Sequence, residues 1–403
     1  MKKALAMILA LAFALALAGC GTSEPLLEGV SPAETGSAED AAALSADFTV
    51  ALFNAAYEGG DALISPVSVL AALAMAESGA RGETLAQMEE LFGVDAETLR
   101  ASLAAYMSSV AGTEAKIANA IWFRDDGTFE PDAGFLSNCA SFAGAEAFAG
   151  KFTDALAGEI NGWVSEHTEG MIDAIVDEID PDAVMYLVNA LSFAADWQEQ
   201  YEEYQMRPGV FHSENGELEV TMMRSEERSY ISGEGFTGFM KPYEGGRYAF
   251  AALLPDGDSS LEAMLASLTG EALAAALAGA EDTAVDTATP KFSGESSFEL
   301  SGALKAMGMT DAFDGGLADF SGMGQSGAGN IFISRVLHRA FIEVDGLGTR
   351  AGAATAVEEV PEESMPPAED PPEVILDRPF AYMIVDREYN IPLFFGVVTG
   401  EGF

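Results

Sequence analysis

Three histidines are the side chains of this 403-residue chain best suited to move protons at neutral pH: His167, His212 and His338. A serine or cysteine nucleophile needs such a base beside it. His338 lies within an apolar run, His167 in a helical segment and His212 beside a polar turn. No two histidines have zinc-helix spacing, and the sequence has no GxSxG or phosphate-loop motif. The 65 acidic residues leave carboxylate-pair chemistry open, but we expect no enzyme, no metal site and no cofactor.

The two cysteines differ in the chemistry that their surroundings favour. Two lysines precede an apolar run over residues 4–18, which is typical of a signal peptide and short for a membrane span. The run ends in Leu-Ala-Gly-Cys at residues 17–20, the pattern of a lipobox. We predict that residues 1–19 are a lipoprotein signal peptide and that Cys20 becomes an acylated, palmitate-type N-terminus. An ordinary signal peptide is the alternative, and Cys139 is expected to be buried rather than reactive.

Charge and composition limit the partners. The net charge of −46 argues against nucleic acid, because phosphate binding needs clustered lysine and arginine. Residues 20–40 are rich in Gly, Ser, Pro and Glu, which predicts a lipidated N-terminus followed by a flexible tether. Residues 41–403 are interpreted as one mixed α and β domain, expected to be a monomer. A lipid on Cys20 would hold this domain to the extracellular side of the cell membrane.

Helical patterns dominate the first part of the chain and strand patterns the later part. Ser65-Pro66 predicts a helix that ends at Gly79, and a second helix is expected over residues 83–92. A third is expected over residues 159–172. Apolar runs without alternation predict strands buried on both faces, over residues 116–123, 184–193, 248–255, 331–344, 379–385 and 391–398. The last two runs are predicted to form a hairpin.

Six segments, in order and spacing, resemble signatures of the serpins, a family of serine-protease inhibitors. They are DALISPVSVLAALAMAESGARGETLAQM (61–88), INGWVSEHTEGMI (160–172), MYLVNALSFAADW (185–197), ATPKFSGESSFELSGALKAMGMTDAF (288–313), ISRVLHRAFIEVDGLGTRAGAATAV (333–357) and the terminal hairpin DRPFAYMIV with IPLFFGVV. The resemblance covers the chain from about residue 41 onward. It implies an α+β serpin fold with three β-sheets, eight or nine helices and an exposed reactive loop at about residues 346–376.

A run of small residues begins that loop. Residues 348–357 read GTRAGAATAV, which is free of proline and charged only at Arg350. Strand alternation places Thr349, Ala351, Ala353, Thr355 and Val357 on one face. With the hinge glycine that the resemblance implies, the expected hinge consists of Gly348, Thr349, Ala351, Ala353 and Thr355. Small side chains can enter a sheet whose core is already packed, and Ala and Gly form strands poorly until the loop is cut. Without its flanking signatures the run would equally suit a flexible linker.

The acidic, proline-rich segment 358–373 has the composition of an exposed protease bait held between two strands. Counting forward from the hinge glycine by the distance that the resemblance implies places the cut between Glu362 and Glu363. Two alternatives remain. The neighbouring bond, Glu363–Ser364, is one, and a count backward from the terminal hairpin gives the other, near Ala368. A Glu-preferring protease is the literal prediction, and elastase-like or subtilisin-like targets stay open.

The resemblance also marks the places where the sheet must open. The matching positions in the polar shutter are Ser65, Ser68, Asn189 and His338. Those in the breach, where the loop first enters the sheet, are Trp197 and Lys291. Two departures stand out. Gly346 and Leu347 replace the family's usual pair of glutamates, so Lys291 is expected to lack its acidic partner. Glu359 would face inward after insertion, which is tolerable only near the open bottom of the sheet.

The function that the resemblance implies is a suicide-substrate cycle. A target serine protease would cut the reactive loop and form a covalent acyl complex, and the freed limb would enter the central sheet as a new strand. The native state must then be a kinetic trap. Two alternatives remain: a non-inhibitory surface lipoprotein of the same fold, and a cross-class inhibitor of papain-like cysteine proteases.

Overall fold

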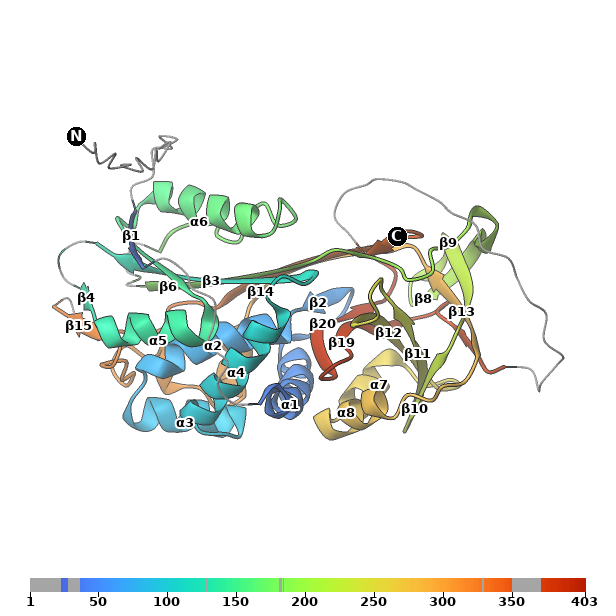
Figure 1. Ribbon diagram of the computed structural model, residues 1–403, viewed down its shortest axis with the longest axis horizontal. Helices are drawn as coiled ribbons and strands as arrows, with labels where there is room; N and C mark the ends of the chain where they lie inside the picture. The colour runs from blue at the N-terminus through green and yellow to red at the C-terminus, as the bar shows by residue number, and fades with distance from the viewer. Residues whose placement is uncertain are drawn as a thin grey trace, which may run out of the picture.

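The computed structural model describes residues 23–27, 37–125, 127, 129–180, 183, 185–327, 330–349 and 371–403. In that part of the chain there are nine α-helices, and most of the strands belong to three large layers of β-sheet (Figure 1). None of the helices described is by itself long and apolar enough to cross a membrane. The helices α7 (Leu261–Ser267) and α8 (Gly270–Ala278) meet the same criterion only as a pair bent by 100°.

The longest layer consists of two ladders that lie side by side (Figure 1). The first ladder has the strand order β1 (Glu24–Leu27), β5 (Glu146–Gly150), β3 (Ala115–Arg124) and β6 (Met185–Phe193). The second has the order β14 (Phe292–Glu299), β16 (Leu337–Val344), β17 (Gly348–Thr349) and β7 (Ala195–Asp196). Because β7 follows β6 directly in the chain, the two ladders form one long sheet that is divided between β6 and β16.

Two further sheets complete the fold. One has the order β10 (Ser229–Gly233), β11 (Phe236–Pro242), β12 (Tyr248–Pro255), β19 (Phe380–Asp386), β20 (Ile391–Val398) and β2 (Ala62–Ile64). Every residue of β12, β19 and β20 is buried, which confirms the strands and the hairpin predicted from unbroken apolar runs. The other has the order β18 (Glu373–Ile375), β13 (Val285–Pro290), β9 (Gly216–Glu227) and β8 (Met206–Ser213). A small separate ladder joins β4 (Phe129–Pro131) and β15 (Gly324–Ser326).

Helices cover both faces of the long sheet. α6 (Asp154–His167) lies on one face, beside β3 and β6, and most other helices lie on the opposite face (Figure 1). α2 (Pro66–Gly79) is buried along nearly its whole length and packs against β6 and β20. It begins after Ser65 with proline in its first turn, as predicted. The other helical segments are α1 (Ala38–Ala56), α3 (Gly82–Phe92), α4 (Ala96–Val110), α5 (Ala133–Ala143), α7 (Leu261–Ser267), α8 (Gly270–Ala278), α9 (Ser301–Ala306) and the 3₁₀ turns Glu203–Gln205 and Asp311–Phe313.

The predicted tether over residues 20–40 is wrong in part. Glu24–Leu27 form β1, which pairs antiparallel with β5 and so extends the edge of the long sheet. α1 begins at Ala38, so the folded domain also starts earlier than residue 41. A four-residue segment is too short to show a periodicity, and its pairing with the edge of β5 makes it a strand.

Two predicted elements have different bounds. α6 spans Asp154–His167 rather than residues 159–172, and the chain beyond it turns at Glu169 and Gly170, whose φ angles are positive. Of the run 331–344, only Leu337–Val344 is a strand, and its residues alternate between buried and partly exposed. This strand is therefore covered on one face, not on both.

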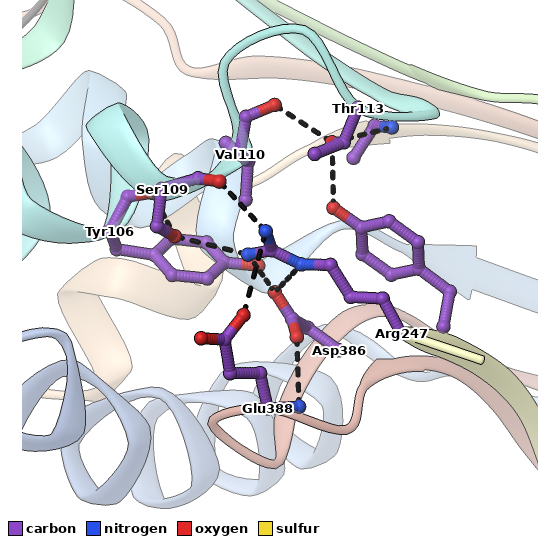
Figure 2. A network of polar contacts seen from close by, with 9 residues as sticks. Tyr106, Ser109, Val110, Thr113, Arg247, Asp386 and Glu388 are labelled. Atoms are coloured by element: carbon purple, nitrogen blue, oxygen red, sulfur yellow. Dashed lines mark hydrogen bonds and ion pairs between the residues drawn. The ribbon is translucent and has the colours of Figure 1, made fainter. Parts of the chain in front are cut away.

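A network of buried polar contacts joins α4 to β12 and β19 (Figure 2). Arg247 donates from Nε and Nη2 to one carboxylate oxygen of Asp386, at 3.2 and 2.8 Å. Its Nη1 and Nη2 also donate to the carbonyl and the hydroxyl of Ser109, at 2.7 and 3.1 Å. The other oxygen of Asp386 accepts from the backbone N–H of Glu388 at 3.0 Å. Burial raises the pKa of the Asp386 carboxyl, and the Arg247 contacts oppose that rise.

Candidate functional site

The start of the predicted hinge already forms a short strand in the long sheet. After β16 the chain turns through Asp345–Leu347 and continues as β17. Thr349 of β17 lies opposite Val344 of β16 on one side and opposite Ala195 of β7 on the other. The reactive loop predicted over residues 346–376 is therefore too long at both ends, because Gly348–Thr349 and Glu373–Ile375 belong to sheets.

Backbone hydrogen bonds hold the turn in front of β17. The indole Nε1 of Trp197 donates to the carbonyl of Asp345 at 2.8 Å, and its backbone N–H donates to Leu347 O at 2.9 Å. The backbone N–H of Tyr201 donates to Gly346 O at 2.9 Å. The Asp345 carboxylate accepts from the N–H groups of Leu347 and Gly348. The non-acidic residues at 346 and 347 are thus held by the main chain, and Asp345 and Tyr201 are contributors that the sequence analysis did not identify.

Close packing explains the residue types at Gly348 and Thr349, the first two positions of the predicted hinge. A Cβ atom added at Gly348 would lie 2.2 Å from the carbonyl oxygen of Ala195, so no larger residue fits between the strands. The side chain of Thr349 points into the core, where the residue is 1% exposed and its hydroxyl shares a hydrogen bond with the hydroxyl of Tyr243. Tyr243 in turn stacks on Trp197, with ring centroids 4.5 Å apart. A larger or charged side chain at position 349 would have to displace this packed aromatic pair.

Lys291 does not carry an ion pair in the described part of the chain. Its backbone N–H donates to Thr221 O at 2.9 Å. A different lysine lies beneath Trp197: the ammonium group of Lys241 is 2.8 Å from Glu227 Oε1, and both side chains are less than a tenth exposed. Lys241 Nζ also lies 5.6 Å from the Trp197 ring centroid, within cation–π range. The breach therefore has a buried charge pair, which no sequence pattern indicates because its members come from different strands.

A slot lies between β6 and β16, directly beyond β17. No ladder joins these two strands in the part of the chain that the structure describes. The slot contains a cavity of about 20 Å³, space for about one water molecule. It is lined by residues of α2, β6 and the segment leading into β16, among them Ser68, Leu73, Leu187, Asn189, Val336 and His338.

His338 closes one side of the slot. Its Nε2 accepts a hydrogen bond from the backbone N–H of Ser65 at 2.9 Å, which requires a neutral ring with the proton on Nδ1. Complete burial lowers the pKa of His338 to about 4. The hydroxyl of Ser65 is buried and makes no hydrogen bond with any described residue. His338 thus ties β16 to the start of α2.

Asn189 closes the other side of the slot. Its amide donates to Oδ1 of Asn119 on β3, and Asn119 donates to the carbonyl of Ala143 at 2.7 Å. Oδ1 of Asn189 is buried and accepts no hydrogen bond from any described residue. The predicted shutter residues therefore lie together but belong to two separate networks. Asn119 was missed, although its place in the middle of an apolar strand run matches that of Asn189 in the sequence.

Several predicted site residues lie outside the described residues. They are the lipidation site Cys20, the hinge residues Ala351, Ala353 and Thr355, and the reactive-bond candidates Glu362, Glu363, Ser364 and Ala368. Cys139, by contrast, is described as a buried free thiol, as predicted. Burial raises the pKa of that thiol to about 12, so it is inert at neutral pH.

Solved structures share this arrangement. The native-state structure of tengpin, a thermophilic serpin, has a TM-score of 0.88 and 38% identity, and the match covers 94% of this chain and 100% of that one. The latent-state structure of tengpin has the same identity but a TM-score of 0.79. Thyroxine-binding globulin in complex with thyroxine has a TM-score of 0.77 at 25% identity, covering 90% of this chain and 100% of that one.

Sequence comparisons agree with the structural ones. Serpin B6 of Pongo abelii is 32% identical over 82% of this chain and 91% of its own length. An uncharacterized serpin-like protein of Thermococcus kodakarensis is 32% identical over 82% of this chain and 79% of its own. The model of the serpin (serine protease inhibitor) family matches residues 43–400. The chain therefore belongs to the serpin family, whose members are in general protease inhibitors.

Proposed function

We propose that this protein inhibits a serine protease as a suicide substrate, by cleavage of the loop that follows β17 and insertion of the freed limb between β6 and β16. One observation carries the proposal: β17 lies between β16 and β7, and among the described residues the two strands beyond it, β6 and β16, are not paired with each other. A limb continuing from Thr349 would find unused backbone groups on both sides. Each ladder hydrogen bond formed there contributes roughly 1 kcal/mol net.

The depth of the slot supports the predicted cut site. Extending the antiparallel pairing of Thr349 with Ala195 brings residue 359 opposite Met185, where β6 begins. A limb that ends at Glu362 is long enough to fill this slot. The inward-facing Glu359 would then lie at the open end of the strand. Mass spectrometry of the peptide that a target protease releases tests this assignment, and a peptide starting at Glu369 would overturn it.

The test of inhibition uses a protease panel and two readouts. We expect an SDS-resistant adduct with at least one serine protease, and a loop-cleaved protein that withstands much more heat than the intact one. If adducts form only with papain-like cysteine proteases, the target class is cysteine proteases and not serine proteases. Cleavage without adduct and without a gain in heat resistance would support a non-inhibitory member instead.

We further propose that the protein is a lipoprotein held by Cys20 at the outer side of the cell membrane. The lipobox at residues 17–20 supports this placement. The anchor would lie close to the folded domain, since β1 begins at Glu24. Metabolic labelling with a fatty acid tests it: label should be incorporated into the wild-type protein and lost in Cys20→Ser.

A further inference from the structure

The buried ion pair of Lys241 and Glu227 lies where the three large sheets meet. Lys241 is near the end of β11, in the six-stranded sheet, and Glu227 is the last residue of β9, in the sheet that contains β13. Trp197 directly follows β7 of the long sheet and forms a single β-bridge with Tyr243, just beyond β11. The pair therefore lies close to the end of β7, the strand that holds one side of β17.

The carboxylate of Glu227 contacts one side of the Lys241 ammonium group. Glu227 Oε1 lies 2.8 Å from Lys241 Nζ and also accepts from the hydroxyl of Ser225 at 2.6 Å. An ammonium group has three N–H donors, and Glu227 is its one oxygen partner among the described residues. The ammonium group also lies over two aromatic rings, 4.4 Å from the ring centroid of Tyr201 and 5.6 Å from that of Trp197. Cation–π attraction to these rings therefore complements the single ion pair.

Burial strengthens the contact between the cation and the rings. The side chains of Lys241 and Glu227 are both less than a tenth exposed, so water and salt screen their charges little. A cation over an aromatic ring also contributes more where it is desolvated than at an exposed site. A buried ammonium group without a counter-ion would be unfavourable. Glu227 therefore makes the buried position of Lys241 possible, and Lys241 in turn contacts both rings.

The residues that carry these two rings also hold the turn in front of β17. The indole and the backbone N–H of Trp197 both donate to carbonyl groups of the turn Asp345–Leu347, and the backbone N–H of Tyr201 donates to a third, at 2.8–2.9 Å. Hydrogen bonds weaken steeply when donor and acceptor are misaligned. A rotation of the indole ring would therefore release the turn at one of its contacts. Lys241 contacts the rings of both residues whose N–H groups hold this turn.

We propose that Lys241, held by Glu227, is a positioning residue for the predicted hinge. It fixes the rings of Trp197 and Tyr201, so that their N–H groups hold the turn and β17 stays between β16 and β7. This inference rests on the proposed function, in which the limb that follows β17 enters the sheet from this position. The turn itself offers no charged side chain at positions 346 and 347, so the positioning charge acts on the turn through the two aromatic residues.

The test removes both charges together. Lys241→Met alone would leave the Glu227 carboxylate buried without a cation and would weaken the whole fold. In the double variant Lys241→Met/Glu227→Leu, apolar side chains of similar size replace the pair, so the denaturation midpoint of the intact protein should stay close to that of the wild type. Hydrogen exchange at the backbone amides of Trp197 and Tyr201 should become roughly tenfold faster, while exchange in β12 should stay unchanged. A purely structural ion pair would not produce this local difference.

Protease trapping is the second readout. The stoichiometry of inhibition of the double variant should rise by about twofold or more, because a loosely held turn delays insertion and gives deacylation more time. The matched control is Arg228→Gln/Asp282→Asn, which removes an exposed ion pair next to Glu227 in the chain and should behave as wild type in both readouts.

Three results would refute the positioning role of Lys241. They are wild-type exchange at Trp197 and Tyr201 in the double variant, faster exchange that extends through β12, and a wild-type stoichiometry of inhibition. If the wild-type protein traps no protease at all, the proposed function fails instead. The exchange measurement uses the intact protein without any protease, so it still decides whether Lys241 positions the turn.

Discussion

The Arg247–Asp386 network and the slot between β6 and β16 are both buried polar regions, yet they differ in how fully their groups are paired. Both oxygens of Asp386 accept hydrogen bonds, and Arg247 has partners on all three of its nitrogens. In the slot, Oδ1 of Asn189 and the hydroxyl of Ser65 have none among the described residues. The first region joins α4 to β12 and β19, two strands that the proposed insertion does not involve. The second lies where the proposed insertion would add a strand.

On the proposed mechanism, this difference separates a region that stays as it is from one that a new strand enters. A buried polar group without a partner costs about 1–3 kcal/mol, whereas a satisfied network resists being opened. On the proposed mechanism, an inserted strand would supply partners to the buried groups of the slot. Variants that act on one region alone test this division.

Thr349→Arg should have the largest effect, which is a loss of protease trapping through the slot and not through the Arg247–Asp386 network. The side chain at 349 is buried against Tyr243, so an arginine cannot be seated there without displacing packed aromatic rings. The variant should be cleaved by the target protease without forming any SDS-resistant adduct. Thr349→Val, which keeps the size and loses only the hydroxyl, should retain most trapping. An arginine variant that still trapped protease would falsify the seated-hinge mechanism.

Arg247→Met should have the next largest effect, on the paired region. It leaves the carboxylate of Asp386 buried beside no cation, a change that costs about 3–5 kcal/mol. Because this region is common to both states, denaturant unfolding should show a similar loss for the intact and the loop-cleaved protein. Glu388→Gln, an exposed neighbour of Arg247, should change stability by less than about 0.5 kcal/mol. A loss confined to the intact form would contradict the division between the regions.

Glu77→Gln should stabilise the intact protein at alkaline pH. Glu77 is 1% exposed on α2, its oxygens have no partner among the described residues, and burial raises its pKa to about 8. A carboxyl whose folded pKa lies above its unfolded value binds more protons when folded, so stability falls as pH rises from about 4.5 through 8. Relative to the Glu77→Gln variant, wild type should lose roughly 3 kcal/mol between about pH 5 and pH 8. If the stabilities of the two proteins depend on pH in the same way, burial does not raise the pKa of Glu77.

The sequence predicts the parts of this fold whose side chains reveal their own surroundings. The strands at 248–255 and 391–398 match their predicted bounds because an unbroken apolar run of that length suits a strand covered on both faces. The end of α3 at Gly93 follows from a left-handed conformation, with φ at 73°. These elements depend on local chemistry alone.

The parts of the fold that the sequence did not predict depend on backbone hydrogen bonds and on contacts between residues far apart in the sequence. The turn at Asp345–Leu347 is held mainly by carbonyl oxygens, which no side-chain pattern displays. β1 is a strand only because the edge of β5 is free to pair with it. Lys241 and Glu227 are buried, although residues of these charged types are usually exposed. The family resemblance predicts the shutter positions, but their division into two networks depends on which strands and helices meet in the folded chain.

His338 should have the smallest effect on folding stability. Its contribution is lost as pH falls, whereas that of Glu77 is lost as pH rises. The folded pKa of about 4 lies below the unfolded value of 6.5, so stability is complete above about pH 6.5 and falls as pH drops toward 4. Between about pH 7 and pH 5.5 wild type should lose roughly 1 kcal/mol more than His338→Gln, whose amide oxygen can still accept from the Ser65 N–H. His212→Gln, at an exposed position on β8, should follow wild type. Since protonation of His338 removes the acceptor that ties β16 to α2, the same acid range should also speed insertion of a cleaved limb. An unchanged insertion rate would mean that this bond does not hold the slot closed.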